Sequence, residues 1–135
     1  MKICGIELKS NNAIVSVIEY LNDEINFIET KIKKIVLEND EDINSVLKFK
    51  NEIESFLNEN AINYIALKKR AKKGTFAGGA VTFKSEAIIQ LNSICEVHFV
   101  TSQAISKYTK INEANLPKNL NKYQEQAYLS SLLLT

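Results

Sequence analysis

Apolar and polar residues alternate over the first third of the chain in the manner of β-strands. Segments rich in β-branched residues cover residues 3–8 and 13–20, and a longer one covers residues 25–36. Polar turn residues separate the three segments. The alternation slips in the middle of the third segment, which favours a bulge or a bend there. The pattern therefore predicts three strands that form an antiparallel meander.

The hydrophobic period becomes helical after residue 38. Residues 39–42 contain three acids, which a helix N-terminus favours, and apolar residues then recur at helical spacing. The apolar face predicted for this helix comprises Ile43, Val46, Leu47, Ile53 and Leu57. A short apolar run at residues 62–67 predicts a buried strand, and residues 97–101 predict another.

Three more helices follow from the remaining pattern. The first begins after Gly79, the second is capped by Thr101 or Ser102 and reaches about residue 108, and the third covers residues 121–134. The inner face predicted for the helix after Gly79 comprises Ala80, Val81, Ala87, Ile88 and Leu91.

The predicted order β-β-β-α-β-α-β-α, in which the last α stands for the short capped helix and the final helix together, indicates an α/β fold with a mixed sheet flanked by helices. The meander supplies antiparallel strands, and right-handed helical crossovers place the last two strands parallel to the first. This layout fits the five-stranded ribonuclease H-like sheet, with the first strand at its centre. Because the sequence contains no repeat or linker, we expect one domain over residues 1–135.

Composition changes this picture little. The chain has 135 residues, of which 45% are hydrophobic, and a formal net charge of +1, so nucleic acid would have to bind through a local patch. Cys4 and Cys95 lie in apolar surroundings, without zinc-ligand spacing, and are expected to be buried free thiols. We see no signal peptide or membrane-spanning run, so we expect a cytoplasmic protein without a membrane partner.

Three motifs carry a resemblance to a known family: residues 1–9 (MKICGIELK), residues 73–84 (KGTFAGGAVTFK) and residues 123–125 (YQE). They resemble a small bacterial domain-of-unknown-function family that is placed near the ribonuclease H-like enzymes. The resemblance spans essentially the whole chain. More distantly, the layout is similar to that of RuvC-type junction resolvases, in which acids lie on the first strand, after the fourth strand and on the last helix.

The RuvC resemblance implies a site in which carboxylates hold Mg²⁺ or Mn²⁺ for phosphodiester cleavage. Glu7 and Glu125 match the first and last acids, and Glu86 is a further candidate ligand. The family resemblance implies a glutamate at the position of Lys69, so this chain departs from the pattern. A lysine ammonium among carboxylates forms ion pairs with them and takes the place of a cation. We therefore expect a degraded metal site and no cofactor.

The strongest local charge feature is the basic run at residues 68–73. It is a candidate for binding nucleic-acid phosphates next to the helix that begins at Gly79, and Phe76 beside it is a candidate for base stacking. The alternative is a solvated loop whose charge the acidic run at residues 38–42 offsets. The candidate phosphate-binding residues are Lys68, Lys69, Arg70, Lys72 and Lys73.

Three functions follow from these features. The first is a non-catalytic binding or assembly module, the second is a metal-dependent nuclease or junction resolvase, and the third is nucleic-acid binding without cleavage. Phe83 and Ile89, which lie off the apolar face of their helix, suggest a homodimer under all three. His98, the only histidine, is expected to be structural because no catalytic motif surrounds it.

Overall fold

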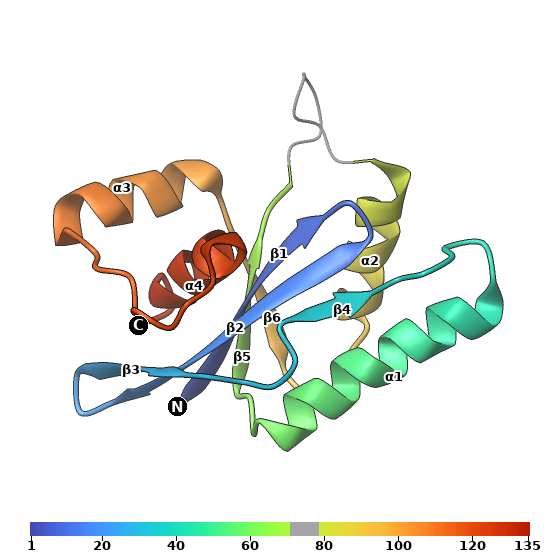
Figure 1. The fold of residues 1–135 in the computed structure, drawn as a ribbon, viewed down its shortest axis with the longest axis horizontal. Helices are drawn as coiled ribbons and strands as arrows, with labels where there is room; N and C mark the ends of the chain where they lie inside the picture. Colours follow the sequence, from blue (N-terminus) through green and yellow to red (C-terminus); the bar gives the residue numbers. More distant parts are fainter. Residues whose placement is uncertain (71–78) are drawn as a thin grey trace.

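A computed structural model describes residues 1–70 and 79–135. In these residues, six strands form one mixed sheet of order β3-β2-β1-β5-β6, and β4 pairs with β2 (Figure 1). The strands are β1 (Lys2–Lys9), β2 (Asn12–Leu21), β3 (Glu24–Ile28), β4 (Lys34–Val36), β5 (Tyr64–Lys68) and β6 (Glu96–Val100). β1 pairs antiparallel with β2 and parallel with β5, and β5 pairs parallel with β6. The predicted mixed sheet with its first strand at the centre is confirmed.

The predicted third strand is divided into two in the structure. β3 pairs with residues 17–21 of β2, and β4 pairs with residues 12–14 of the same strand. β2 is ten residues long and so has room for both partners along one edge. The slip in alternation between residues 25 and 36 marks the segment that joins the two short strands.

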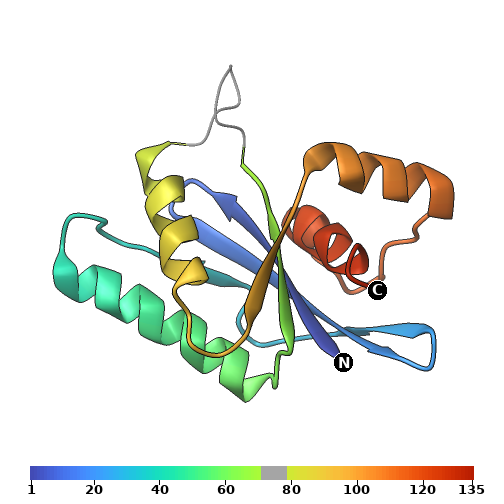
Figure 2. The same cartoon turned by 180° about the vertical axis from the view of Figure 1, so that it is seen from behind.

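The helices form two layers, one on each face of the sheet (Figures 1 and 2). They are α1 (Ile43–Glu59), α2 (Ala80–Gln90), α3 (Ser102–Asn112) and α4 (Glu125–Leu132), the last preceded by the 3₁₀ turn η1 (Lys122–Gln124). The Thr101 hydroxyl caps α3 by accepting a hydrogen bond from Ala104 N–H at 3.1 Å, as the sequence predicts. This helix ends at Asn112, one turn beyond the predicted end.

Strand alternation divides the core into two parts. Cys4 and Ile6 of β1 and Ile65 and Leu67 of β5 pack in the cluster under α1 and α2. Ile3 of β1 belongs to the cluster on the opposite face, which is covered by α3 and α4. Consequently, the odd-numbered residues of β1, which include Gly5 and Glu7, face α4.

Both predicted helix faces are partly wrong. In α1 the buried residues are Phe49, Ile53, Phe56 and Leu57, whereas Ile43 and Leu47 are exposed. The buried face of α2 comprises Thr82, Ser85, Ile88 and Ile89, while Ala80, Ala87 and Leu91 are exposed. Two small polar residues, Thr82 and Ser85, lie on the inner face of α2, so the spacing of its apolar residues predicts the wrong buried face.

This difference in the buried face of α2 removes one of the two residues behind the homodimer prediction. Ile89 is fully buried in the core and offers no surface to a partner. Phe83 is 41% exposed, and the guanidinium of Arg70 lies 3.3 Å from the centroid of its ring. The homodimer therefore stays a prediction that rests on Phe83 alone.

Gly5 sets the distance between β1 and α4. A Cβ atom at this position would overlap the carbonyl oxygen of Ala127 and lie 2.8 Å from its carbonyl carbon. The backbone of α4 therefore packs directly on the central strand, which only glycine permits.

The two cysteines are free thiols, as the sequence predicts. Cys4 is buried as predicted, whereas Cys95 is only half-buried. His98 is exposed and lies 3.4 Å from the carboxylate of Glu96. Of the helices within residues 1–70 and 79–135, none combines the length and apolarity needed to cross a bilayer.

Candidate functional site

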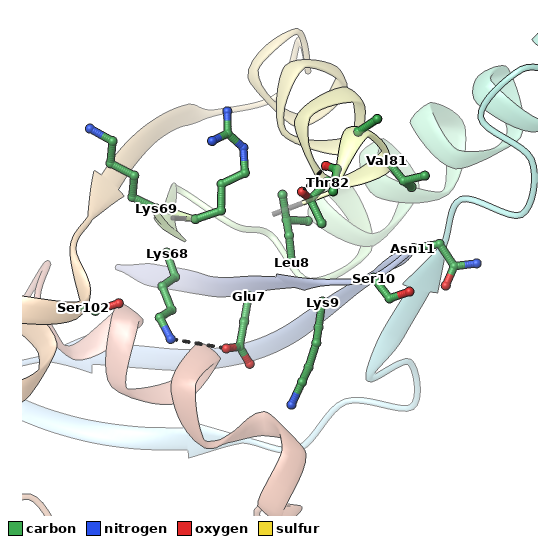
Figure 3. Close-up of a pocket in the computed structure, with 13 residues that line it drawn as sticks. Glu7, Leu8, Lys9, Ser10, Asn11, Lys68, Lys69, Val81, Thr82 and Ser102 are labelled. Carbon is green, nitrogen blue, oxygen red and sulfur yellow. Dashed lines mark hydrogen bonds and ion pairs between the residues drawn. The ribbon is translucent and has the colours of Figure 1, made fainter. Parts of the chain in front are cut away.

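A cleft of about 480 Å³ opens where β1 and β5 end side by side. Its lining comes from the end of β1 and the following turn, the end of β5, the start of α2, and Ser102 at the start of α3 (Figure 3). The crevice at the carboxyl ends of parallel strands is the usual ligand site of open α/β sheets. The cleft is therefore the first place to look for function.

An ion pair between β1 and β5 lies in the cleft. Lys68 Nζ is 3.3 Å from Glu7 Oε2, and these side chains are 20% and 16% exposed (Figure 3). Glu7 faces opposite to Ile6 and Leu8, as the alternation predicts, because both neighbours pack in the α1–α2 core. The first predicted metal-ligating acid is thus neutralised by a lysine.

The lysine that pairs with Glu7 is Lys68, whereas the sequence predicts this role for Lys69. Strand alternation explains the difference, because Lys68 shares the α4 face of the sheet with Ala66 and Glu7. Lys69 follows the end of β5; its side chain is exposed and points away from Glu7 (Figure 3). The predicted ion pair between a lysine and Glu7 is therefore present, but its lysine is Lys68 and not Lys69.

A second ion pair holds Arg70 against α2. Arg70 Nη2 lies 3.2 Å from Glu86 Oε1, and these side chains are 9% and 14% exposed. Glu86 lines neither the cleft nor the hollow shared by Glu7 and Glu125. The structure therefore does not bring Glu86 together with the other two candidate acids.

Glu125 lies near Glu7 because the start of α4 is anchored to the sheet. The preceding residue, Gln124, is buried and donates a hydrogen bond from Nε2 to the Val15 carbonyl of β2 at 2.9 Å. Its Oε1 accepts from the backbone N–H of Asn121 at 3.2 Å, which completes a capping box. Glu7 and Glu125 consequently line one shallow hollow with Lys9 and Lys122.

These acids do not form a metal-binding cluster. Within residues 1–70 and 79–135, no group of three or more His, Cys, Asp or Glu side chains is placed to hold a metal ion. A two-metal site needs several carboxylates around the ions, and here the carboxylate on β1 has a lysine as its partner. The described residues therefore do not fit the divalent metals implied by the resemblance.

The remaining groups of the cleft suit an anion. Lys68 is paired with Glu7 and Arg70 with Glu86, but Lys9 and Lys69 have no ion-pair partner among the described residues. Ala80 and Val81, the first residues of α2, also line the cleft, and the first N–H groups of a helix have no partner within it. Cationic side chains and a helix N-terminus together favour phosphate.

Only part of this cleft is predicted from the sequence. Lys9, the turn residues Ser10 and Asn11, and Ser102 are not among the predicted site residues. The sequence does predict a turn after the first strand, and Lys9 and Asn12 pair across a two-residue turn in which Ser10 has a φ of 56°. This turn ends β1 beside the end of its parallel neighbour, β5.

The basic run is only partly described. Lys68, Lys69 and Arg70 line the cleft, whereas Lys72, Lys73 and Phe76 lie outside the described residues. In the described residues, members of the acidic run pair with helix lysines instead of this basic run. Glu38 lies 3.2 Å from Lys48 of α1, and Asp40 lies 3.7 Å from Lys84 of α2.

The chain belongs to the family described as "Protein of unknown function (DUF3010)", whose model matches residues 1–133. This result confirms the predicted membership of a domain-of-unknown-function group. A search of curated proteins finds no match.

Several solved structures resemble this chain over nearly its whole length. RuvC of Thermus thermophilus has a TM-score of 0.67 at 8% identity, and the match covers 98% of this chain and 92% of RuvC. Fowlpox virus resolvase, solved with Holliday junction DNA, has a TM-score of 0.55 at 19% identity, with coverage of 99% and 93%. The yeast mitochondrial Holliday junction resolvase has a TM-score of 0.58 at 11% identity, with coverage of 97% and 74%.

These similarities establish the fold. The chain has the ribonuclease H-like fold of the RuvC type, as the order of its elements predicts. At such low identity they carry no catalytic residues over to this chain, so the site has to be judged on its own side chains.

Proposed function

We propose that this member of the DUF3010 family binds the phosphate backbone of nucleic acid in the basic cleft and does not cleave it by metal catalysis. The observation that carries the proposal is the ion pair between Lys68 and Glu7. It neutralises the carboxylate on the central strand, so this acid is less able to hold a divalent cation. Phosphate then meets the uncompensated ammonium groups of Lys9 and Lys69.

Similarity of fold also supports a nucleic-acid partner. The Thermus thermophilus RuvC and fowlpox virus resolvase structures include complexes with Holliday junction DNA. In this chain, the cleft at the ends of the parallel strands carries the basic side chains that such a partner would need.

The test is a titration of fluorescently labelled branched and linear DNA at several salt concentrations, followed by fluorescence anisotropy. Each phosphate contact contributes about −0.9 to the slope of log K against log salt for duplex DNA. We expect Lys69→Ala to weaken binding and to reduce this slope by about one contact. Lys31→Ala is the matched control, because this exposed lysine lies beside Glu59, at the end of α1, and not in the cleft.

Cleavage is measured on the same DNA after addition of Mg²⁺ or Mn²⁺. The proposal expects intact DNA and binding that persists in EDTA. Binding that is independent of salt, or equal losses from Lys69→Ala and Lys31→Ala, would contradict the phosphate-binding cleft. Metal-dependent strand cleavage that Glu7→Gln abolishes would support the alternative function, a nuclease that uses Glu7 and Glu125.

That alternative rests on one observation of its own. Glu7 and Glu125 line the same hollow although they come from opposite ends of the chain. A nuclease would require Lys68 to leave Glu7 when a metal ion binds. The ion pair in the structure favours phosphate binding over this reaction.

A further inference from the structure

The basic cleft continues into two neighbouring hollows. It shares Ser102 with a hollow on the surface of α3, and it shares Glu7 and Lys9 with the hollow beside η1 and α4. Figure 3 shows Ser102 on one side of the Glu7–Lys68 pair and Lys9 on the other. The three hollows therefore form one path across this edge of the molecule.

The added hollows extend the basic character of the cleft. The α3 hollow is lined by Lys107 and Lys110, one helical turn apart, together with uncharged polar side chains. The α4 hollow contributes Lys122. Among the described residues, no acid lies within ion-pairing distance of these three lysines. With Lys9 and Lys69, the path carries five lysines without an ion-pair partner among the described residues, beside the acids Glu7 and Glu125.

An aromatic side chain stands at one end of the path. Tyr123 lines the α4 hollow, its ring is 39% exposed, and Lys34 Nζ lies 4.2 Å from the ring centroid. The cation–π contact fixes the ring from one side and adds a further cation. An exposed aromatic ring beside a basic groove is the arrangement on which proteins stack unpaired bases.

We infer that the path formed by the three hollows binds a single-stranded segment of nucleic acid. Its phosphates follow the lysines from α3 through the cleft to η1, and a base stacks on Tyr123. A duplex keeps its base faces stacked inside the helix, so it cannot use the ring in this way. The inference rests on the proposed function and specifies which form of nucleic acid the same site takes.

The test compares labelled oligothymidylates of increasing length with a duplex of equal phosphate number, by fluorescence anisotropy in EDTA. We expect single strands to bind more tightly than the duplex, with affinity rising until the strand spans all three hollows. Tyr123→Leu should weaken single-strand binding by on the order of tenfold and leave duplex binding unchanged. Lys107→Ala should weaken the binding of long strands only.

Two control variants are matched to these changes. Tyr64→Leu replaces a tyrosine of similar exposure, which packs against His98 and lines a different hollow, and Lys31→Ala replaces an exposed lysine of another hollow. Both should bind like the wild type, and thermal unfolding checks that each variant is folded.

Three outcomes would overturn the inference. If single strands and duplex bind with equal affinity and Tyr123→Leu has no effect, no base stacks on Tyr123. If Lys69→Ala weakens the affinity for DNA but Lys107→Ala and Tyr123→Leu do not, binding is confined to the cleft. The inference then fails, while the proposed function stands. Absence of binding to every nucleic acid contradicts both.

Discussion

Lys68 Nζ lies 3.3 Å from Glu7 Oε2, on the two parallel strands at the centre of the sheet. The pair places an ammonium group beside the acid that, by resemblance to metal-dependent nucleases, is predicted to bind a metal ion. Both side chains are largely buried, so solvent screens their interaction only in part. Because the two charges of the pair cancel, the positive character of the cleft comes from Lys9 and Lys69.

Glu7→Gln is expected to increase affinity for DNA in EDTA. The substitution removes the negative charge of the cleft and releases Lys68 to contact phosphate. Two charges at this separation interact by about 1 kcal/mol even in water, which corresponds to about fivefold in affinity. Anisotropy titration measures the change, with Glu59→Gln as the control on the exposed end of α1. Unchanged or weaker binding of Glu7→Gln would mean that phosphate does not approach this pair.

Gly5→Ala is expected to destabilise the protein by about 3 kcal/mol, because the added methyl group overlaps the Ala127 backbone and forces α4 from the sheet. Urea unfolding measures the loss. Gly79→Ala is the comparison variant: its added Cβ meets nothing within 4 Å, its φ is −74°, and it should cost no more than about 1 kcal/mol, because alanine is a poorer helix N-cap than glycine. Equal losses in the two variants would show that α4 does not need the close approach.

Glu54 makes part of the stability depend on pH. Its pKa is lowered first by the Ser93 backbone N–H, 2.9 Å away, and then by Lys50 and the Ser93 hydroxyl. A lowered pKa means that the folded state binds this proton less readily than the unfolded state. The carboxylate therefore stabilises the fold at neutral pH, and this contribution disappears as the pH falls through the lowered pKa.

Denaturant unfolding at a series of pH values tests this link between α1 and the residues after α2. The wild type should lose more stability than Glu54→Gln between neutral pH and the acidic range. Parallel curves for the two proteins would show that the hydrogen bonds from Ser93 do not favour the charged carboxylate.

The two thiols are expected to react slowly in the folded protein. Burial raises the pKa of Cys95 to about 11, and it raises that of the fully buried Cys4 further. Only the thiolate is nucleophilic, so both groups stay protonated and inert near neutral pH. Iodoacetamide labelling followed by mass spectrometry should modify Cys95 slowly, faster as the pH rises, and Cys4 only after unfolding. Rapid labelling of native Cys4 at neutral pH would contradict its place in the core.

The sequence predicts most of the fold because strand alternation and the change of period are strong signals. Its errors occur where tertiary packing overrides that pattern. Thr82 and Ser85 occupy the buried face of α2, and one apolar segment supplies two partners for β2. Neither choice is encoded in local hydrophobicity.

The candidate site was harder to predict because it depends on which strand ends meet. A lysine opposite Glu7 was foreseeable, but its identity follows from the register of β5 against β1. Lys9 and Ser102 reach the cleft only because a turn and a helix start lie beside those strand ends. Such proximity between distant segments is a property of the folded chain, and no motif in the sequence marks it.

The central claim is that an ammonium group, and not a metal ion, is the partner of the acid on β1. Isothermal titration of Mn²⁺ into the wild-type protein and into Glu7→Gln tests it most directly. The account predicts no saturable binding in either protein. Stoichiometric binding of Mn²⁺ by the wild type, lost in Glu7→Gln, would contradict it.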